Sequence, residues 1–185
     1  MKQRGPRPKP ASLTFAQRLQ RHTQAGSFRE SGWFRDPDLL AEMGPALADL
    51  ARNEDVDLIL APQSRGTLLG ALVATSLGIG LIELRKEVSR FATTDVWVTA
   101  STPLDYRDRN LELGVPGGLL PTGARVVFVD DWIDTGGQML AAHTITTLAG
   151  ANWCGTAVLV DGLGDPRLRR DYAVRSDEHT SELQS

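Results

Sequence analysis

Short apolar runs alternate with longer amphipathic stretches through the middle of the chain. Four apolar runs predict buried strands: 57–61, 80–85, 125–130 and 155–161. The stretches 66–78 and 136–150 carry small and apolar residues at helical spacing and predict helices. Strands that are apolar on both faces are typical of a parallel sheet covered by helices. The alternation therefore predicts an α/β fold, an open and mainly parallel sheet flanked by helices.

The N-terminal part of the chain reads as helical. A helix is expected from Ser12, whose hydroxyl can cap it. Pro37 suits the first turn of a second helix. The pair Gly44-Pro45 is expected to break that helix, with a further helix running to about Arg52.

Three segments depart from this pattern. Residues 1–11 are basic and Pro-rich and predict a disordered arm. Residues 87–124 are polar, contain three prolines, and hold a possible antiparallel strand pair; a connection this long is our candidate lid. Residues 176–185 are polar and aperiodic, typical either of a disordered terminus or of a foreign tail from library-derived sequence. We therefore expect one domain over 12–175.

Composition narrows the functional classes. A net charge of -3 argues against nucleic-acid binding, which needs a basic face. No apolar run has the length of a membrane span. The single cysteine, Cys154, excludes an internal disulfide and favours a reducing, cytoplasmic setting. The three histidines lie far apart, so no zinc-ligand spacing is present.

The strongest chemical signal lies in residues 126–142, VVFVDDWIDTGGQMLAA. An apolar strand ends at Asp130-Asp131, and Thr135-Gly136-Gly137 then opens a helix. The first turn of a helix has unpaired N–H groups and a dipole that favours anions, and glycine lets a phosphate approach the backbone. The acids precede this turn, where they can bind sugar hydroxyls. Neither a Walker loop nor a G-x-G-x-x-G pattern is present.

This segment resembles the motif of type I phosphoribosyltransferases that binds 5-phosphoribosyl-1-pyrophosphate (PRPP). The resemblance implies that Asp130 and Asp131 bind the ribose. It also implies a loop for the 5-phosphate, made of Asp134, Thr135, Gly136, Gly137 and Gln138. Gln138 stands where the family often has Thr or Ser. The family's fold adds a small N-terminal hood and a flexible lid to the sheet.

Most of residues 28–161 are similar to the adenine-specific subgroup of that family. APQSRG (61–66) resembles its pyrophosphate loop, which implies pyrophosphate contacts from Ser64, Arg65 and Gly66 and an unusual peptide at Gln63-Ser64. Arg85-Lys86 resembles an R-K pair with the same role. Arginine and lysine at the carboxyl ends of neighbouring strands suit phosphate oxygens.

The base site carries weaker signals. WFRD (33–36) resembles the subgroup's base pocket, which implies that Phe34 stacks on the base and that Arg35 binds its edge; Phe34 is equally consistent with a hydrophobic staple. Within the candidate lid, Asp105 and Tyr106 occupy the places of catalytic residues, although the family has Glu where Asp105 stands. The absence of lysine near Asp161 argues against 6-oxopurines, whereas Asp134 resembles an acid of enzymes specific for them.

The resemblance implies a phosphoribosyltransferase that transfers the phosphoribosyl group of PRPP to a nitrogenous base and releases pyrophosphate. The order of the motifs indicates a purine, and adenine in particular. The resemblance also implies Mg²⁺, held by Asp130 or Asp131 directly or through water, and a homodimer. The alternative is a regulatory module that binds PRPP or a nucleotide without catalysis, because a fold does not fix its function.

Overall fold

The protein is described here from a computed structural model, which defines residues 14–24, 32–52, 55–86, 96–103 and 110–179. The chain divides into two compact units, residues 1–42 and 43–185. Within the first unit, Arg18 forms an ion pair with Glu42. The expected domain bounds, 12–175, stay a prediction.

The first unit contains α1 (Phe15–Gln24) and a 3-10 helix, η2 (Gly32–Arg35). Thr14 caps α1, because its hydroxyl accepts the Gln17 N–H at 3.3 Å and its own N–H donates to Gln17 Oε1 at 3.0 Å. The cap is therefore two residues later than the Ser12 we expected, and Ser12 itself lies outside the described residues.

Helix α2 (Pro37–Ala51) begins at Pro37, as the sequence predicts, and the Asp36 carboxylate caps it through the N–H groups of Asp38 and Leu39. The expected break at Gly44-Pro45 is wrong, since α2 continues through Pro45. Packing explains the difference. A Cβ at Gly44 would lie 2.8 Å from the carbonyl oxygen of Leu72, so α2 packs closely against the following helix at this point.

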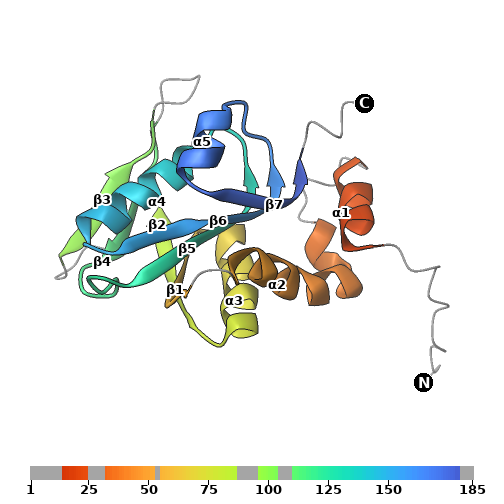
Figure 1. The fold of residues 1–185 in the computed structure, drawn as a ribbon, viewed down its shortest axis with the longest axis horizontal. Helices are drawn as coiled ribbons and strands as arrows, with labels where there is room; N and C mark the ends of the chain where they lie inside the picture. The colour runs from red at the N-terminus through yellow and green to blue at the C-terminus, as the bar shows by residue number, and fades with distance from the viewer. Residues whose placement is uncertain (1–13, 25–31, 53–54, 87–95, 104–109, 180–185) are drawn as a thin grey trace. The chain divides into compact units, whose positions relative to one another are not determined.

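The second unit is built on a seven-stranded sheet in the order β3-β4-β2-β1-β5-β6-β7 (Figure 1). The strands are β1 (Leu58–Pro62), β2 (Gly80–Lys86), β3 (Trp97–Ser101), β4 (Glu112–Pro116), β5 (Arg125–Ile133), β6 (Asn152–Asp161) and β7 (Val174–His179). Strands β2, β1, β5, β6 and β7 run parallel, and β3 and β4 add an antiparallel edge. The open, mainly parallel α/β sheet is thereby confirmed, as is the antiparallel pair within 87–124.

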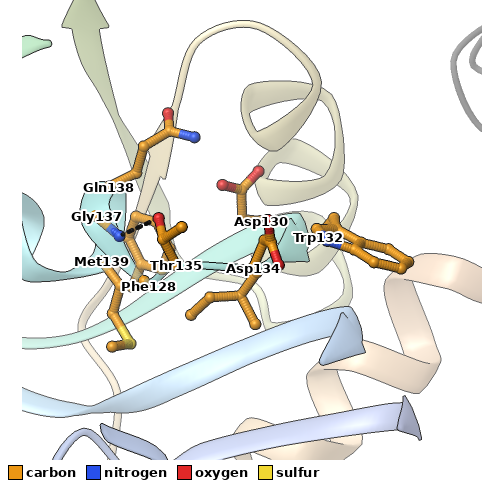
Figure 2. Close-up of a pocket in the computed structure, with 10 residues that line it drawn as sticks. Phe128, Asp130, Trp132, Asp134, Thr135, Gly137, Gln138 and Met139 are labelled. Carbon is orange, nitrogen blue, oxygen red and sulfur yellow. Dashed lines mark hydrogen bonds between the residues drawn. The ribbon is translucent and has the colours of Figure 1, made fainter. Parts of the chain in front are cut away.

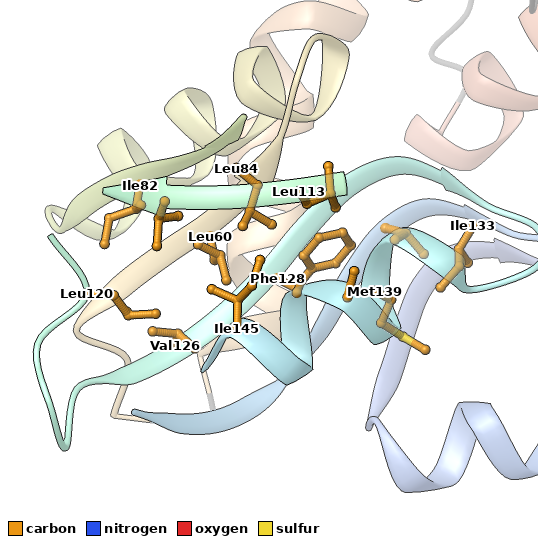
Figure 3. Packing of buried hydrophobic residues seen from close by; sticks show 14 of the residues in the cluster. Leu60, Ile82, Leu84, Leu113, Leu120, Val126, Phe128, Ile133, Met139 and Ile145 are labelled. Atoms are coloured by element: carbon orange, nitrogen blue, oxygen red, sulfur yellow. The ribbon is translucent and has the colours of Figure 1, made fainter. Parts of the chain in front are cut away.

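Helices α3 (Arg65–Leu77) and α4 (Gly137–Leu148) connect neighbouring parallel strands and cover opposite faces of the sheet (Figure 1). On one face Gly70 of α3 lies against Ile59 and Ala61 of β1. On the other, Leu60 and Phe128 join Met139 and Ile145 of α4 in a buried apolar cluster (Figure 3). Burial of both faces explains why the parallel strands are nearly continuous apolar runs.

The C-terminal part adds α5 (Pro166–Asp171) and β7. Strand β7 pairs with β6 up to Asp161↔His179, so residues 176–179 form strand where we expected a disordered tail; an exposed sheet edge accepts almost any backbone as a further strand. Residues 180–185, like the arm 1–11, lie outside the described residues. Among the helices that the structure describes, none is both long and apolar enough to cross a membrane.

Candidate active site

The ends of β1 and β5 meet at the point where the chain connectivity reverses. From β1 the chain crosses through α3 to β2 on one side, and from β5 it crosses through α4 to β6 on the other. The pairing Leu60↔Phe128 aligns β1 with β5, so the loop after β1 and the acids of β5 reach the same sheet edge. Such a switch point is where open α/β sheets form binding crevices.

The loop after β5 ends in an N-terminal helix turn suited to an anion. Gly136 has a φ of 77°, a left-handed conformation that favours glycine, and directs the chain into α4. The first turn of α4, all of it described, contains no acidic residue, and its N-cap residue, Gly136, makes no side-chain cap. The Gly137 N–H donates to Thr135 Oγ1 at 3.4 Å. The turn therefore presents N–H groups and a positive dipole end to a ligand.

The residues of this loop line a pocket (Figure 2). It is lined by Phe128, Asp130, Trp132, Ile133, Asp134, Thr135, Gly136, Gly137, Gln138 and Met139. Five of the residues expected to bind ribose and phosphate thus share one pocket with Asp130. Figure 2 shows the Asp130 carboxylate and the Gln138 amide beside the loop, while the indole of Trp132 extends away from Thr135.

The acid pair is buried and electrostatically strained. Asp130 and Asp131 are each 6% exposed, and the Asp131 N–H donates to Asp130 Oδ1 at 2.9 Å. Burial, followed by the charge of Asp131, raises the pKa of Asp130 well above its usual value, and nearby Lys86 opposes that shift. Two neighbouring carboxylates that are both buried favour the binding of a cation beside them.

The loop after β1 approaches these acids closely. The Arg65 Nε lies 2.6 Å from Asp131 Oδ2. A Cβ at Gly66 would lie 2.9 Å from Asp130 Oδ1 and 2.7 Å from the Pro62 ring, so a larger residue would push the loop away from the acid. The Gln63-Ser64 peptide bond is cis, at the position where the resemblance implied an unusual peptide. Arg65 and Gly66 therefore lie beside the acid pair, and Ser64 directly precedes them.

The basic pair ends β2, the strand next to β1. Lys86 is close enough to lower the pKa of Asp130 and so belongs to the same electrostatic cluster. Arg85 lies 3.4 Å, Nε to Oε2, from Glu83 on its own strand. Arg85 thus lies beside Glu83 and Lys86 beside Asp130, and their shared role in binding pyrophosphate stays a prediction.

Four expected site residues lie outside the described residues or in the other unit. Asp105 and Tyr106 lie outside the described residues. Phe34 and Arg35 lie in η2, in the first unit. Their catalytic and base-binding roles stay predictions.

Several residues at this site were not expected from the sequence. Trp132, Ile133 and Met139 line the pocket, whereas the expected ribose and phosphate contacts were Asp130, Asp131 and residues 134–138. Trp132 and Ile133 stand between the acid pair and Asp134, so their place inside the motif was the available signal. Across the part of the chain that the structure describes, no three His, Cys, Asp or Glu residues gather as a metal site.

Known proteins that resemble this chain are phosphoribosyltransferases. A family model described as the phosphoribosyl transferase domain matches residues 35–184. An adenine phosphoribosyltransferase of Saccharopolyspora erythraea is 34% identical over 165 residues, 82% of this chain and 88% of its own. One of Mycolicibacterium vanbaalenii is 38% identical over 122 residues, 66% of this chain and 67% of its own.

Solved structures agree with these relatives. The crystal structure of adenine phosphoribosyltransferase from Thermoanaerobacter pseudethanolicus superposes with a TM-score of 0.69 at 26% identity, covering 79% of this chain and 83% of that one. The Trypanosoma brucei enzyme, in complex with AMP, pyrophosphate and ribose-5-phosphate, gives a TM-score of 0.68 at 21% identity, over 80% and 68% of the two chains, and at that identity shares the fold.

Proposed function

This chain belongs to the phosphoribosyltransferase family, and we propose that it transfers the 5-phosphoribosyl group of PRPP to adenine and releases pyrophosphate. One observation carries the proposal. A buried pair of carboxylates, a Gly-rich helix N-terminus and the arginine of a second loop meet at the switch point of the sheet. PRPP has a diol, a monophosphate and a pyrophosphate at matching positions, so each feature has a chemical partner in one substrate.

Each group has a separate task in this proposal. Asp130 and Asp131 accept hydrogen bonds from the ribose hydroxyls, and residues 134–138 bind the 5-phosphate through N–H and hydroxyl donors. Ser64, Arg65 and Gly66, with Arg85 and Lys86, bind the pyrophosphate. As the ring nitrogen of the base bonds to the anomeric carbon, the bond between that carbon and pyrophosphate breaks. The base also loses a proton. Asp105 is the proposed acceptor of this proton, and Tyr106, the next residue in the sequence, is proposed to assist it. The site works by orientation and charge stabilisation.

Magnesium fits the acid pair. The raised pKa of Asp130 reflects burial and the repulsion of Asp131, both of which a cation relieves. Two carboxylates are too few to enclose Mg²⁺, which keeps several waters and commonly shares phosphate oxygens with its substrate. Asp130 and Asp131 would hold the ion directly or through water. When bound, it neutralises charge on the leaving pyrophosphate.

The choice of adenine rests on the order of motifs and on the curated relatives named for that base. Phe34 and Arg35 are the proposed base contacts. A lysine after the strand that ends at Asp161 would suit recognition of a 6-oxo group, but no lysine follows that strand. A pocket with the wrong hydrogen-bond polarity leaves a buried group unpaired, at a cost of about 1–3 kcal/mol for each group.

A substrate panel tests the proposal. Pyrophosphate release is measured with Mg²⁺, PRPP and, in turn, adenine, hypoxanthine, guanine, xanthine, uracil and orotate. We expect adenine to give the highest kcat/KM. Another base that exceeds adenine about tenfold, which is about 1.4 kcal/mol of transition-state binding, would overturn the assignment. Binding of PRPP without turnover of any base would favour the regulatory alternative.

We also propose that the enzyme is a homodimer that acts in the cytoplasm on small molecules, without nucleic acid or membrane partners. A lone cysteine and a slightly acidic chain support this setting. Analytical ultracentrifugation across a range of protein concentrations tests the dimer, and a purely monomeric boundary at micromolar concentration would contradict it.

A further inference from the structure

The side chain of Glu83 connects β2 to the loop that follows β1. Glu83 lies opposite Ala61 in the parallel pairing of the two strands. Its Oε1 accepts the Thr67 hydroxyl at 3.0 Å, and its Oε2 accepts the Gln63 Nε2 at 3.1 Å and lies 3.4 Å from the Arg85 Nε. One carboxylate thereby contacts the loop, the first turn of α3 and the basic end of β2.

Gln63 carries the connection further. Its Oε1 accepts the Lys86 N–H at 3.1 Å, and its own N–H donates to the Leu84 carbonyl at 3.0 Å. With the bond to Glu83, Gln63 is fixed to β2 at three points. Ser64, Arg65 and Gly66 follow it directly, so the path of these residues depends on how Gln63 is held.

We propose that Glu83 is a positioning residue for pyrophosphate binding, acting through Gln63, Thr67 and Arg85. The inference rests on the function proposed above and assigns a task to a residue that the pyrophosphate motifs do not include. Glu83 and pyrophosphate are both negative, so a direct contact would be repulsive. The carboxylate acts instead as an acceptor of charge-assisted hydrogen bonds, which are stronger and more directional than neutral ones. At 30% side-chain exposure it is partly shielded from competing water.

The test compares Glu83→Ala, Glu83→Gln and Gln63→Ala with the wild type. Calorimetry measures the Kd of Mg-pyrophosphate and of Mg-PRPP, and steady-state assays give KM and kcat. We expect Glu83→Ala and Gln63→Ala each to weaken pyrophosphate and PRPP binding about tenfold. The double variant should lose no more affinity than the single variant that binds more weakly. Glu83→Gln keeps one acceptor oxygen and should give an intermediate loss. Because Glu83 contacts no reacting atom, kcat at saturating PRPP and the KM of the base should change less than about twofold.

Glu112→Ala, at an exposed position that begins β4, is the matched control and should leave pyrophosphate affinity unchanged. Wild-type pyrophosphate affinity in Glu83→Ala, or fully additive losses in the double variant, would overturn the inference and leave the proposed function intact. A wild-type protein that binds neither PRPP nor pyrophosphate would overturn both. If Glu83→Ala fails to fold by circular dichroism, Gln63→Ala decides, since it removes the same connection from the loop side.

Discussion

At the scale of single residues, the acid pair is organised for a ligand at the expense of the ligand-free protein. Asp130 is 6% exposed, and its pKa is raised first by burial and then by Asp131. An Asp with a raised pKa contributes stability at low pH that is lost as the pH rises through the raised value. Ionisation of Asp130 as the pH rises therefore lowers the free energy of unfolding until a cation or the Mg-PRPP complex binds.

Asp130→Asn should separate stability from binding. Without ligand, we expect its Tm to exceed that of the wild type at pH 8 by a few degrees, at about 2–4 °C per kcal/mol for a chain of this size, with the difference vanishing at pH 4. Calorimetry should show PRPP affinity reduced at least tenfold, and lost when Asp131→Asn is added. Asp134→Asn, in the exposed part of the loop, is the control for Tm. Unchanged PRPP affinity in the double variant with a normal circular dichroism spectrum would refute the ribose assignment.

At the scale of elements, the loop after β6 supports the phosphate loop. The Gly162 N–H donates to the Ile133 carbonyl at 2.7 Å, and a Cβ at Gly136 would lie 3.3 Å from the Leu163 side chain. Asp161, whose side chain is fully buried, pairs with Arg169 of α5 and accepts the Leu163 N–H at 2.9 Å. The ion pair thus holds the loop after β6, which in turn contacts the phosphate loop through Gly162 and Leu163.

Arg169→Ala should destabilise the protein by about 2 kcal/mol, because it leaves the buried Asp161 charge without its partner, and should lower the Tm by about 4–8 °C. The double variant Asp161→Asn/Arg169→Ala removes that charge and should recover part of the loss. Thermal melts followed by circular dichroism measure both. Arg170→Ala, exposed on the same helix, is the control and should change the Tm little. A double variant as unstable as Arg169→Ala would mean that packing, rather than charge, is the larger factor.

At the scale of the whole molecule, the sequence predicted what depends on local pattern and missed what depends on contacts across the sheet. The parallel strands, their helices and the phosphate loop were predictable because burial on both faces and an anion-binding helix start leave short signatures. The continuous α2 depends on the contact of Gly44 with Leu72, and the Glu83–Gln63 bond joins two strands. Neither pairing has a signature in the local sequence.

The C-terminal strand shows the same limit. Residues 176–179 lie in β7, yet among the residues that the structure describes, Ser176 Oγ and Asp177 Oδ2 are buried without a hydrogen-bond partner. Burial, and then the charge of Asp49, raises the pKa of Asp177 to about 6. These costs offset the hydrogen bonds of an edge strand. Residues 176–179 therefore gain little from joining the sheet, as expected for the polar, aperiodic tail that the sequence indicated.

We therefore predict that deleting residues 176–185 changes the Tm by no more than a few degrees at pH 7.5. Asp177 contributes stability that is present at low pH and lost as the pH rises through about 6, so the deletion should cost more at pH 4.5 than at pH 7.5. Asp177→Asn in the full chain should remove this pH dependence and raise the Tm at pH 7.5. The effect should stay small, because solvent screens a partly exposed carboxylate. Scanning calorimetry at the two pH values measures all three proteins. A fall of many degrees on deletion at pH 7.5 would show instead that the end of β7 stabilises the sheet.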